Sequence, residues 1–241
     1  MTDQAYTDAA EFAGSGLVCI RGERIVFADL DFSLAPGEAI LLLGPNGSGK
    51  SSLLRLMAGL LRPTAGTLTW GGVPLADDPE AHGGRSRYIG HHDAIKPVLS
   101  VRENVAFWSR LWNGDGSEAT VRAALEAFTI PHLLEVPGRW LSAGQKRRVN
   151  LARLLAAPAP LWLLDEPTTA LDRATVAVVE RLLDAHRARG GMVVLSTHTD
   201  VALPGARVLQ MDDFAVPMDW SGFDAEMATA EGEPWTAGVR P

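Results

Sequence analysis

The sequence predicts an α/β protein built around a parallel sheet. Three short apolar segments, 39–43, 161–164 and 192–195, have the length and unbroken hydrophobic character of strands that are buried on both faces. Segments with the helical spacing of apolar residues lie between them, and this alternation of strand and helix is typical of α/β folds. The 241 residues are 46% hydrophobic, which is enough to bury a large core.

A glycine-rich segment follows the first predicted strand and precedes a predicted helix at 51–60. It matches the phosphate-binding pattern G-x-x-x-x-G-K-[ST] with the residues Gly44, Pro45, Asn46, Gly47, Ser48, Gly49, Lys50 and Ser51. Glycines let the backbone wrap closely around a phosphate chain, and the amides at the helix N-terminus point toward its negative charge. We expect Lys50 to contact the β- and γ-phosphates and the Ser51 hydroxyl to bind Mg²⁺. The alternative is a plain glycine-rich turn, which the flanking strand and helix disfavour.

The next helices are predicted from their caps. Ser100 and Glu103 have the spacing of a capping box, so a helix is expected to start there and to run to Trp112, before the breaker at 113–116. Another helix is predicted at 118–128, and it ends before a proline. Residues 93–140 are therefore predicted to form a small helical insertion in the α/β body.

Two carboxylates end the second predicted strand. Asp165 lies at the position where phosphate-binding enzymes hold Mg²⁺, and Glu166 follows it directly. A carboxylate at this position can polarise a water molecule for attack on the γ-phosphate. An acidic pair after a strand is often only a solvated strand end, but the phosphate-binding segment in the same chain favours the catalytic interpretation.

The segment 141–148, Leu-Ser-Ala-Gly-Gln-Lys-Arg-Arg, has the form of a helix start with Ser142 as the N-cap. It also resembles the signature motif of ATP-binding cassette (ABC) ATPases. The resemblance covers nearly all of 17–211, because the other motifs follow in the order of that family. They are the phosphate-binding segment, the helical insertion, the signature, Asp165 with Glu166, the D-loop 169–172 ending in Asp172, and His198 after the last predicted strand.

The resemblance implies a P-loop NTPase of the ABC ATPase fold with a small inserted helical subdomain. In that family two cassettes face head to tail, so a second copy of the chain is the expected partner. Ser142, Gly144 and Gln145 would then act on the ATP of the partner copy, with Asp172 nearby in the D-loop. His198 would contact the γ-phosphate, although a lone histidine after a strand is more often structural. The implied activity is Mg²⁺-dependent ATP hydrolysis.

Three segments resemble a narrower family, the ATP-binding subunits of the cytochrome c maturation system. These segments are 88–96, 141–145 and 159–167. The resemblance implies a peripheral subunit on the cytoplasmic face of the bacterial inner membrane, working with the integral membrane subunits of that system. ATP hydrolysis would be linked to haem delivery through release of a haem-loaded chaperone. The sequence has no C-x-x-C-H motif and no other haem ligand is assigned, so haem handling would belong to the partners.

The sequence departs from the wider ABC pattern at two positions. His92 stands where a glutamine usually contacts the metal site and senses the membrane partner, and we hypothesise that imidazole replaces it functionally. The alternative is an ordinary polar loop. Arg21 stands where an aromatic residue commonly stacks on adenine, and its guanidinium can stack on a base or lie free on the surface. Trp108 and Trp112, on one face of the predicted helix, are expected to pack inside the insertion rather than to contact a partner.

The net charge of −7 is concentrated at the two ends of the chain. Residues 1–16 carry three acidic side chains and no basic one, and 212–241 carry seven against one, so 17–211 has a net charge of +2. We expect the leader 1–16 to be flexible and the tail 212–241 to be mostly disordered. The absence of a basic excess disfavours nucleic acid as a partner. Two rivals remain: the ATPase subunit of a transporter for another cargo, and an ABC protein acting on ribosomes or DNA.

Overall fold

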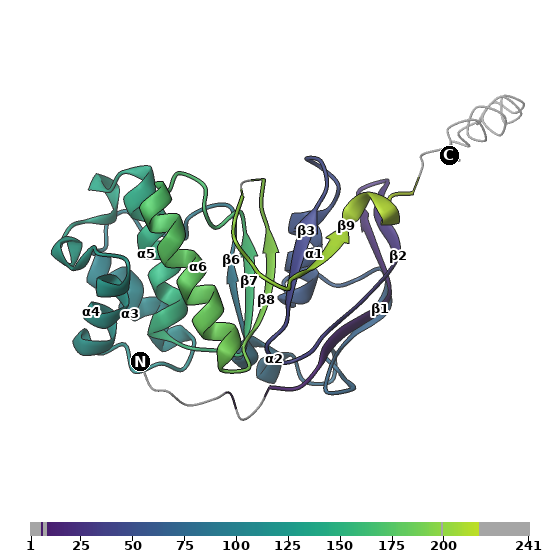
Figure 1. The fold of residues 1–241 in the computed structure, drawn as a ribbon. Helices are drawn as coiled ribbons and strands as arrows, with labels where there is room; N and C mark the ends of the chain where they lie inside the picture. The colour runs from purple at the N-terminus through teal and green to yellow at the C-terminus, as the bar shows by residue number, and fades with distance from the viewer. Residues whose placement is uncertain (1–5, 7–8, 199, 217–241) are drawn as a thin grey trace, which may run out of the picture.

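The computed structural model describes residues 6, 9–198 and 200–216, and it contains the predicted parallel sheet (Figure 1). Five strands lie in the order β6-β7-β8-β3-β9 and pair in parallel. They are β3 (Ala39–Leu43), β6 (Ser86–Ile89), β7 (Leu161–Asp165), β8 (Met192–Ser196) and β9 (Arg207–Gln210). The three predicted strands are therefore confirmed as the neighbours β7, β8 and β3, with β7 and β8 each one residue longer than predicted.

Alternate residues of the central strands face two different hydrophobic cores. Leu161 of β7 packs in a cluster with helix α1 (Lys50–Met57). Its neighbour Trp162 packs in another cluster with helix α6 (Arg173–Ala188) and the helical layer. Every residue of β7 and β8 is buried. This burial on both faces explains why these strands are unbroken apolar runs rather than alternating ones.

A second sheet, which the apolar segments do not predict, is antiparallel and has the order β2-β1-β4-β5. Its strands are β1 (Phe12–Arg21), β2 (Arg24–Leu34), β4 (Ala65–Trp70) and β5 (Val73–Pro74). Its buried residues share a core with α1, so that α1 lies between the two sheets. Register shifts in the pairing of β1 with β2 and β4 interrupt the alternation of apolar and polar residues, which weakens the sequence signal.

The predicted flexible leader, 1–16, overlaps this second sheet, and that boundary is wrong. β1 begins at Phe12, whose side chain is fully buried and packs edge-on against Phe32 at a ring distance of 5.3 Å. Residues 12–16 therefore belong to the fold. The remaining part of the leader lies mostly outside the described residues, although Tyr6 contacts His186 at 3.2 Å.

A helical layer covers one side of the parallel sheet, at the left in Figure 1. Its helices are α3 (Val101–Leu111), α4 (Glu118–Ala127) and α5 (Ala143–Ala156), with short 3-10 turns at Pro131–Leu133 and Gly138–Trp140. The predicted start at Ser100 is confirmed, because its side chain and that of Glu103 form the capping box. The predicted limit at residue 140 falls just before α5, which packs against both α3 and α4.

The remaining elements lie at the edges of these layers. Helix α2 (Pro79–Arg85) precedes β6, and β9 leads into a 3-10 turn, η3 (Met211–Phe214), that begins with a buried methionine. The predicted tail, 212–241, thus starts inside a regular element, and 217–241 lies outside the described residues. Among the helices of the described part, none is long and apolar enough to cross a membrane.

Candidate ATP site

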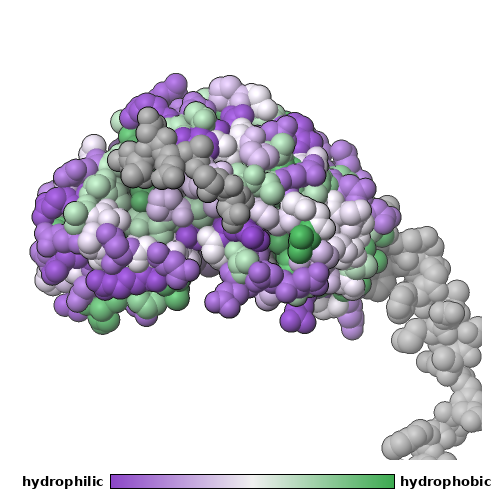
Figure 2. Space-filling model, turned by 90° about the horizontal axis from the view of Figure 1, so that it is seen from below, coloured by the Kyte–Doolittle hydropathy of each residue, from purple (hydrophilic) through white to green (hydrophobic). Residues whose placement is uncertain are grey.

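The motif residues gather where the parallel strands end, at the top of the sheet in Figure 1. Carboxyl ends of parallel strands meet at one edge of a sheet, and ligands of α/β proteins bind there. Figure 2 views the molecule from the other end, where hydrophobic residues form small separate patches among hydrophilic ones. The candidate site therefore occupies the position that the fold class favours.

The glycine-rich segment forms a tight loop between β3 and α1. Gly49 caps α1 with a φ of 101°, in the left-handed region that favours glycine. A Cβ atom at this position would lie only 2.7 Å from Val26 Cγ1, so the close approach of β2 also requires glycine. The loop consequently directs the amides at the N-terminus of α1 toward the pocket.

The Lys50 side chain folds back over its own loop. Its Nζ donates hydrogen bonds to the carbonyl oxygens of Gly44 at 2.6 Å and Pro45 at 2.9 Å, and the residue is 7% exposed. These two bonds fix the ammonium at the pocket wall. A phosphate group that enters the pocket therefore meets a cation already in place.

The pocket itself has a volume of about 540 Å³ and brings predicted residues from distant parts of the chain together. Lys50, Ser51, Asp165, Glu166 and His198 all line it. The other lining residues are Val26, Asn46, Gly47, Gly49, Ser52, His91 and Thr169. Positive, negative and hydroxyl groups thus face one space, which is the arrangement required to hold a nucleoside triphosphate with a divalent cation.

Asp165, the last residue of β7, is 2% exposed and is held from two neighbouring strands. Its Oδ1 accepts a hydrogen bond of 2.8 Å from the Ser196 hydroxyl, and its Oδ2 accepts one of 3.5 Å from the Tyr88 hydroxyl. Burial and the nearby Asp165 carboxylate raise the pKa of Tyr88, so this phenol stays a donor. Asp165 is therefore fixed in the wall of the pocket that Ser51 also lines.

Glu166 occupies a sharp turn directly after β7. Its φ of 51° is left-handed, and its backbone N–H donates to the Ser196 carbonyl at 3.0 Å. The His198 backbone N–H donates to Oε2 at 3.2 Å, and His198 Nε2 lies 3.6 Å from Oε1. Among the described residues, buried Oε1 has no hydrogen-bond partner. One oxygen is thus anchored, and the other is left to accept a hydrogen bond from a bound molecule.

The two adjacent histidines differ from the prediction. His91 lines the phosphate pocket, whereas His92 lines a neighbouring groove together with Trp108 and Trp112. The expected position of His92 beside the metal site is therefore not the one observed in this conformation. The chain leaves β6 through an exposed loop in which the two imidazole rings meet edge-on at a centroid distance of 5.4 Å; His91 lines both the pocket and the groove, and His92 lines the groove. Both tryptophans are half-buried and line that groove, so they are not fully packed inside the insertion as expected.

Arg21 is exposed at the end of β1 and does not line the pocket. Val26 of the neighbouring strand lines the pocket in its place, beside the glycine-rich loop. The surface interpretation of Arg21 fits this geometry better than stacking on adenine. Sequence reasoning missed Val26 because a lone valine in a strand carries no chemical signal.

The predicted signature residues lie outside the pocket, at the exposed start of α5. Ser142 and Gln145 form a capping box, with the Ser142 N–H donating to Gln145 Oε1 at 2.9 Å and the Gln145 N–H donating to Ser142 Oγ at 3.3 Å. The predicted N-cap is therefore confirmed. Gly144 follows in the same turn. None of the three residues lines the pocket of its own chain.

Asp172 is the N-cap of α6 and accepts a 2.7 Å hydrogen bond from the Thr175 N–H. Its other oxygen pairs with Arg148 of the signature helix, also at 2.7 Å. The hydrogen bonds from Thr175 contribute most, and together with Arg148 they lower the pKa of Asp172 and keep its carboxyl group ionised. The D-loop and the signature helix are thus tied together within one chain.

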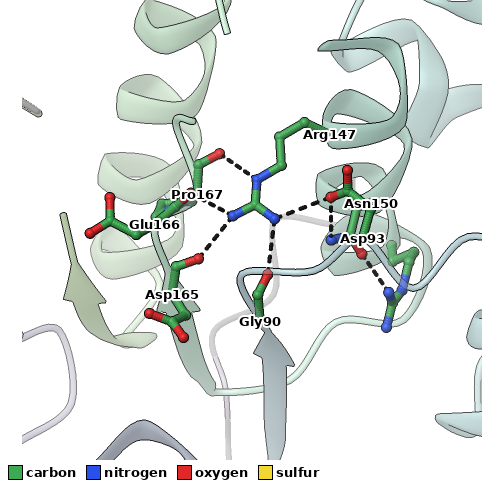
Figure 3. A network of polar contacts seen from close by, with 8 residues as sticks. Gly90, Asp93, Arg147, Asn150, Asp165, Glu166 and Pro167 are labelled. Atoms are coloured by element: carbon green, nitrogen blue, oxygen red, sulfur yellow. Dashed lines mark hydrogen bonds and ion pairs between the residues drawn. The ribbon is translucent and has the colours of Figure 1, made fainter. Parts of the chain in front are cut away.

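Sequence reasoning also missed Arg147, which lies on α5 directly before Arg148. Its guanidinium is buried between the turn at Asp165–Pro167 and the loop that begins at Gly90 (Figure 3). Its partners are chiefly backbone carbonyl oxygens, which leave no trace in the sequence. The available signal is weak, an arginine with Asn150 one turn later on the same face of the helix.

Comparison with known proteins gives a consistent result. Residues 27–169 match the ABC transporter family. A cytochrome c biogenesis ATP-binding export protein CcmA from Rhodospirillum rubrum is 68% identical over 206 residues, which are 86% of this chain and 88% of that protein. A protein of the same description from Paramagnetospirillum magneticum is 61% identical over 207 residues, or 85% of this chain and 95% of that one.

A solved structure shows the same fold. It is a putative ABC transporter ATP-binding protein from Pyrococcus furiosus, with a TM-score of 0.75 and 21% identity. The match covers 86% of this chain and all of that chain. The pocket, the order of the motifs and these matches agree. The chain belongs to the ABC transporter ATP-binding family and, within it, to the cytochrome c biogenesis ATP-binding export proteins called CcmA.

Proposed function

We propose that this chain is the ATP-hydrolysing subunit of a membrane-associated ABC complex that serves cytochrome c biogenesis. The observation that carries the proposal is the convergence of Lys50, Ser51, Asp165, Glu166 and His198 on one pocket. Family membership and the names of the two relatives supply the biological setting.

The phosphate chain of ATP is held by the loop and by Lys50. The ammonium exchanges its bonds to the Gly44 and Pro45 carbonyls for bonds to the β- and γ-phosphates, and the amides of the loop and of the α1 N-terminus bind the same oxygens. The lysine is already close to its working position. Binding therefore requires little rearrangement of this side chain.

The metal donors are the Ser51 hydroxyl and the Asp165 carboxylate, which both line the pocket. This donor set fits Mg²⁺, which usually takes one or two protein oxygens and completes its shell with water and phosphate oxygens. Mg²⁺ would neutralise the charge that develops on the phosphates. Asp165 is kept in place for this role by Ser196. His91 is the histidine positioned to contact the same space, and His92 is left to sense a partner from the groove.

Glu166 is the general base of the proposed mechanism. Its free Oε1 accepts a proton from the water that attacks the γ-phosphate, while Oε2 stays bonded to the His198 backbone. The His198 imidazole is 48% exposed and lines the same pocket, and it would contact the γ-phosphate. Phosphate departs when these contacts are broken.

A second copy of the chain completes each site in this proposal. Ser142, Gly144 and Gln145 stand at an exposed helix start and would close over the ATP of the other copy, with Asp172 beside them. A helix N-terminus is a suitable group to meet the γ-phosphate. Motion then passes through the His92 loop and the helical layer into integral membrane subunits on the cytoplasmic face of the inner membrane. Those subunits would handle haem, and hydrolysis would be linked to its delivery.

Purification of the tagged chain from detergent-solubilised membranes tests this setting. Co-purification of integral membrane proteins that carry haem supports the proposal. Co-purification of membrane proteins that have no role in haem handling would leave the proposed ATPase activity standing but would assign it to a different cargo. Ribosomes or DNA in place of membrane proteins would overturn it.

A further inference from the structure

The Arg147 guanidinium holds the turn that carries Glu166. Arg147 is 3% exposed, and its Nε donates to the Pro167 carbonyl at 3.0 Å. Its Nη2 donates to the carbonyls of Asp165 at 2.9 Å and Glu166 at 2.5 Å (Figure 3). Three consecutive carbonyl groups of the turn are therefore bonded to one planar cation.

The other side of the same guanidinium holds the loop after β6. Nη1 donates to the Gly90 carbonyl at 2.9 Å and to Asp93 Oδ1 at 3.2 Å. A guanidinium has five N–H groups, and here all five have an acceptor. The loop between these two contacts contains His91 and His92, so Arg147 links that loop to the turn of Glu166.

The turn needs such support because of its backbone geometry. The Glu166 backbone is in the left-handed region of φ. This conformation costs free energy for any residue other than glycine and persists only where the surroundings enforce it. The direction of the Glu166 carboxylate follows from this backbone. Arg147 bonds the carbonyls of Asp165 and Glu166, which belong to the two peptide planes on either side of Glu166, and so it restrains both planes that set the direction.

The network continues from Asp93 into the helical layer. Asp93 Oδ1 also accepts a hydrogen bond of 3.1 Å from Asn150 Nδ2, and Asn150 Oδ1 accepts one from Arg153. The Arg153 guanidinium lies 3.7 Å from the ring centre of Trp108, in the wall of the groove. Asn150 and Arg153 are both buried, so solvent does not compete with these bonds.

We propose that Arg147 is a positioning residue for ATP hydrolysis. It keeps the Glu166 carboxylate and the Gly90–Asp93 loop in one fixed relation, without contacting the nucleotide. The inference rests on the proposed function, because it assumes that Glu166 activates the attacking water. Misplacing a reacting group by about 1 Å can reduce a rate by about a hundredfold. Loss of Arg147 should therefore lower the rate of hydrolysis much more than the binding of ATP.

The variant Arg147→Lys tests this in the full chain, since lysine keeps the charge but has neither the planar fork nor five donors. We expect kcat to fall by about tenfold to a hundredfold with KM for ATP changed less than about threefold. Arg147→Gln, which buries no charge, is expected to show the same pattern and replaces the lysine variant if that one does not fold.

Arg87→Lys is the matched control. Arg87 is 2% exposed and donates to carbonyl groups of 83, 84, 86, 112, 157 and 158, away from the turn. Arg87→Lys is expected to lower the melting temperature about as much as Arg147→Lys, but to leave kcat per folded chain unchanged. If kcat of the two lysine variants falls equally, the inference is overturned.

A double variant separates positioning from a general loss of structure. In a Glu166→Gln background the base is already absent, so Arg147→Lys should cause no further loss in slow single-turnover hydrolysis. If the two substitutions instead lower the hydrolysis rate independently, so that their effects multiply, the inference is overturned and the proposed function stands. A wild-type chain that does not hydrolyse ATP would instead overturn the proposed function, and this inference with it.

Discussion

Glu166 combines a left-handed backbone, one anchored carboxylate oxygen and one oxygen without a hydrogen-bond partner among the described residues. Glu166→Gln keeps the size of the side chain but removes its capacity to take a proton. Hydrolysis is expected to fall by about 10² to 10⁴, while ATP binding is retained. ATP-bound closed dimers should then accumulate and be visible in size-exclusion chromatography with Mg²⁺ and ATP. Normal turnover in this variant would remove Glu166 from the role of base.

His92 lies in the groove rather than in the phosphate pocket. His92→Gln should retain ATPase activity within about twofold, because the amide can donate and accept hydrogen bonds at similar reach. Steady-state phosphate release measures this directly. A large loss would show that the imidazole is needed for more than hydrogen bonding, and the functional equivalence with glutamine would fail.

At the residue scale, the sequence predicts those site residues whose chemistry depends on local spacing. The placement of Lys50, Ser51 and Asp165 in one pocket follows from a loop motif and from the rule that parallel strands end at the same edge. Arg147 does not follow from any motif, since its partners are mainly carbonyl oxygens that every residue possesses. His91 and His92 could not be distinguished, because an exposed loop does not fix the direction of its side chains.

Two helices of the chain begin with the same capping geometry. Ser100 with Glu103 caps α3, and Ser142 with Gln145 caps α5. Each serine-to-alanine change should lower the free energy of unfolding by about 1 kcal/mol, because one helix N–H group loses its acceptor. Only Ser142→Ala should also lower ATPase activity per folded chain. Urea unfolding and phosphate release on both variants measure the two effects, and equal activity would leave Ser142 with a structural role alone.

The end of α6 carries a buried histidine that makes stability depend on pH. His186 is fully buried, stacks on Trp162 at 3.8 Å, and has a pKa lowered to about 3, first of all by burial. In the unfolded chain its pKa is about 6.5, so below that pH the unfolded state binds a proton that the folded state does not. Stability therefore falls with decreasing pH, by about 2 kcal/mol between pH 6.5 and 5. Urea unfolding at these two pH values measures the loss.

His186→Gln provides the control for this dependence. The variant is expected to be less stable at pH 7 but to lose less stability on acidification. His82 is also buried and has a lowered pKa, but it is present in both chains and its contribution cancels in the comparison. If the variant and the wild type lose stability equally between the two pH values, His186 is not the group that titrates.

At the scale of the whole molecule, the two sheets differ in how well the sequence predicts them. The parallel strands are covered on both faces, and the resulting apolar runs locate β3, β7 and β8. The antiparallel sheet buries one face and contains register shifts, so its alternation is broken and the sequence predicts a flexible leader that overlaps the start of β1. Helix α5 packs on α3 and α4 of the helical layer, and its first residues carry the signature. Sequence spacing alone does not assign this helix to the helical layer or to the α/β body.

The separation of the signature from the pocket of its own chain leads to a prediction about assembly. In a head-to-tail dimer, each site combines the Lys50 loop of one copy with the Ser142 helix of the other. Lys50→Ala and Ser142→Ala should each have strongly reduced activity alone, but a mixture contains heterodimers with one intact site.

Equal mixing should restore about a quarter of wild-type ATPase activity, because half of the dimers are mixed and each has one working site of two. The control is a chain carrying both changes, mixed with wild type. Its heterodimers have no intact site, so it should only reduce activity. If the signature acts on the ATP of the other copy, the first mixture should regain activity, and the control should fall to about a quarter of wild-type activity, which comes from its wild-type homodimers. If each chain instead used its own signature, the first mixture would regain no activity and the control would keep about half of the wild-type activity.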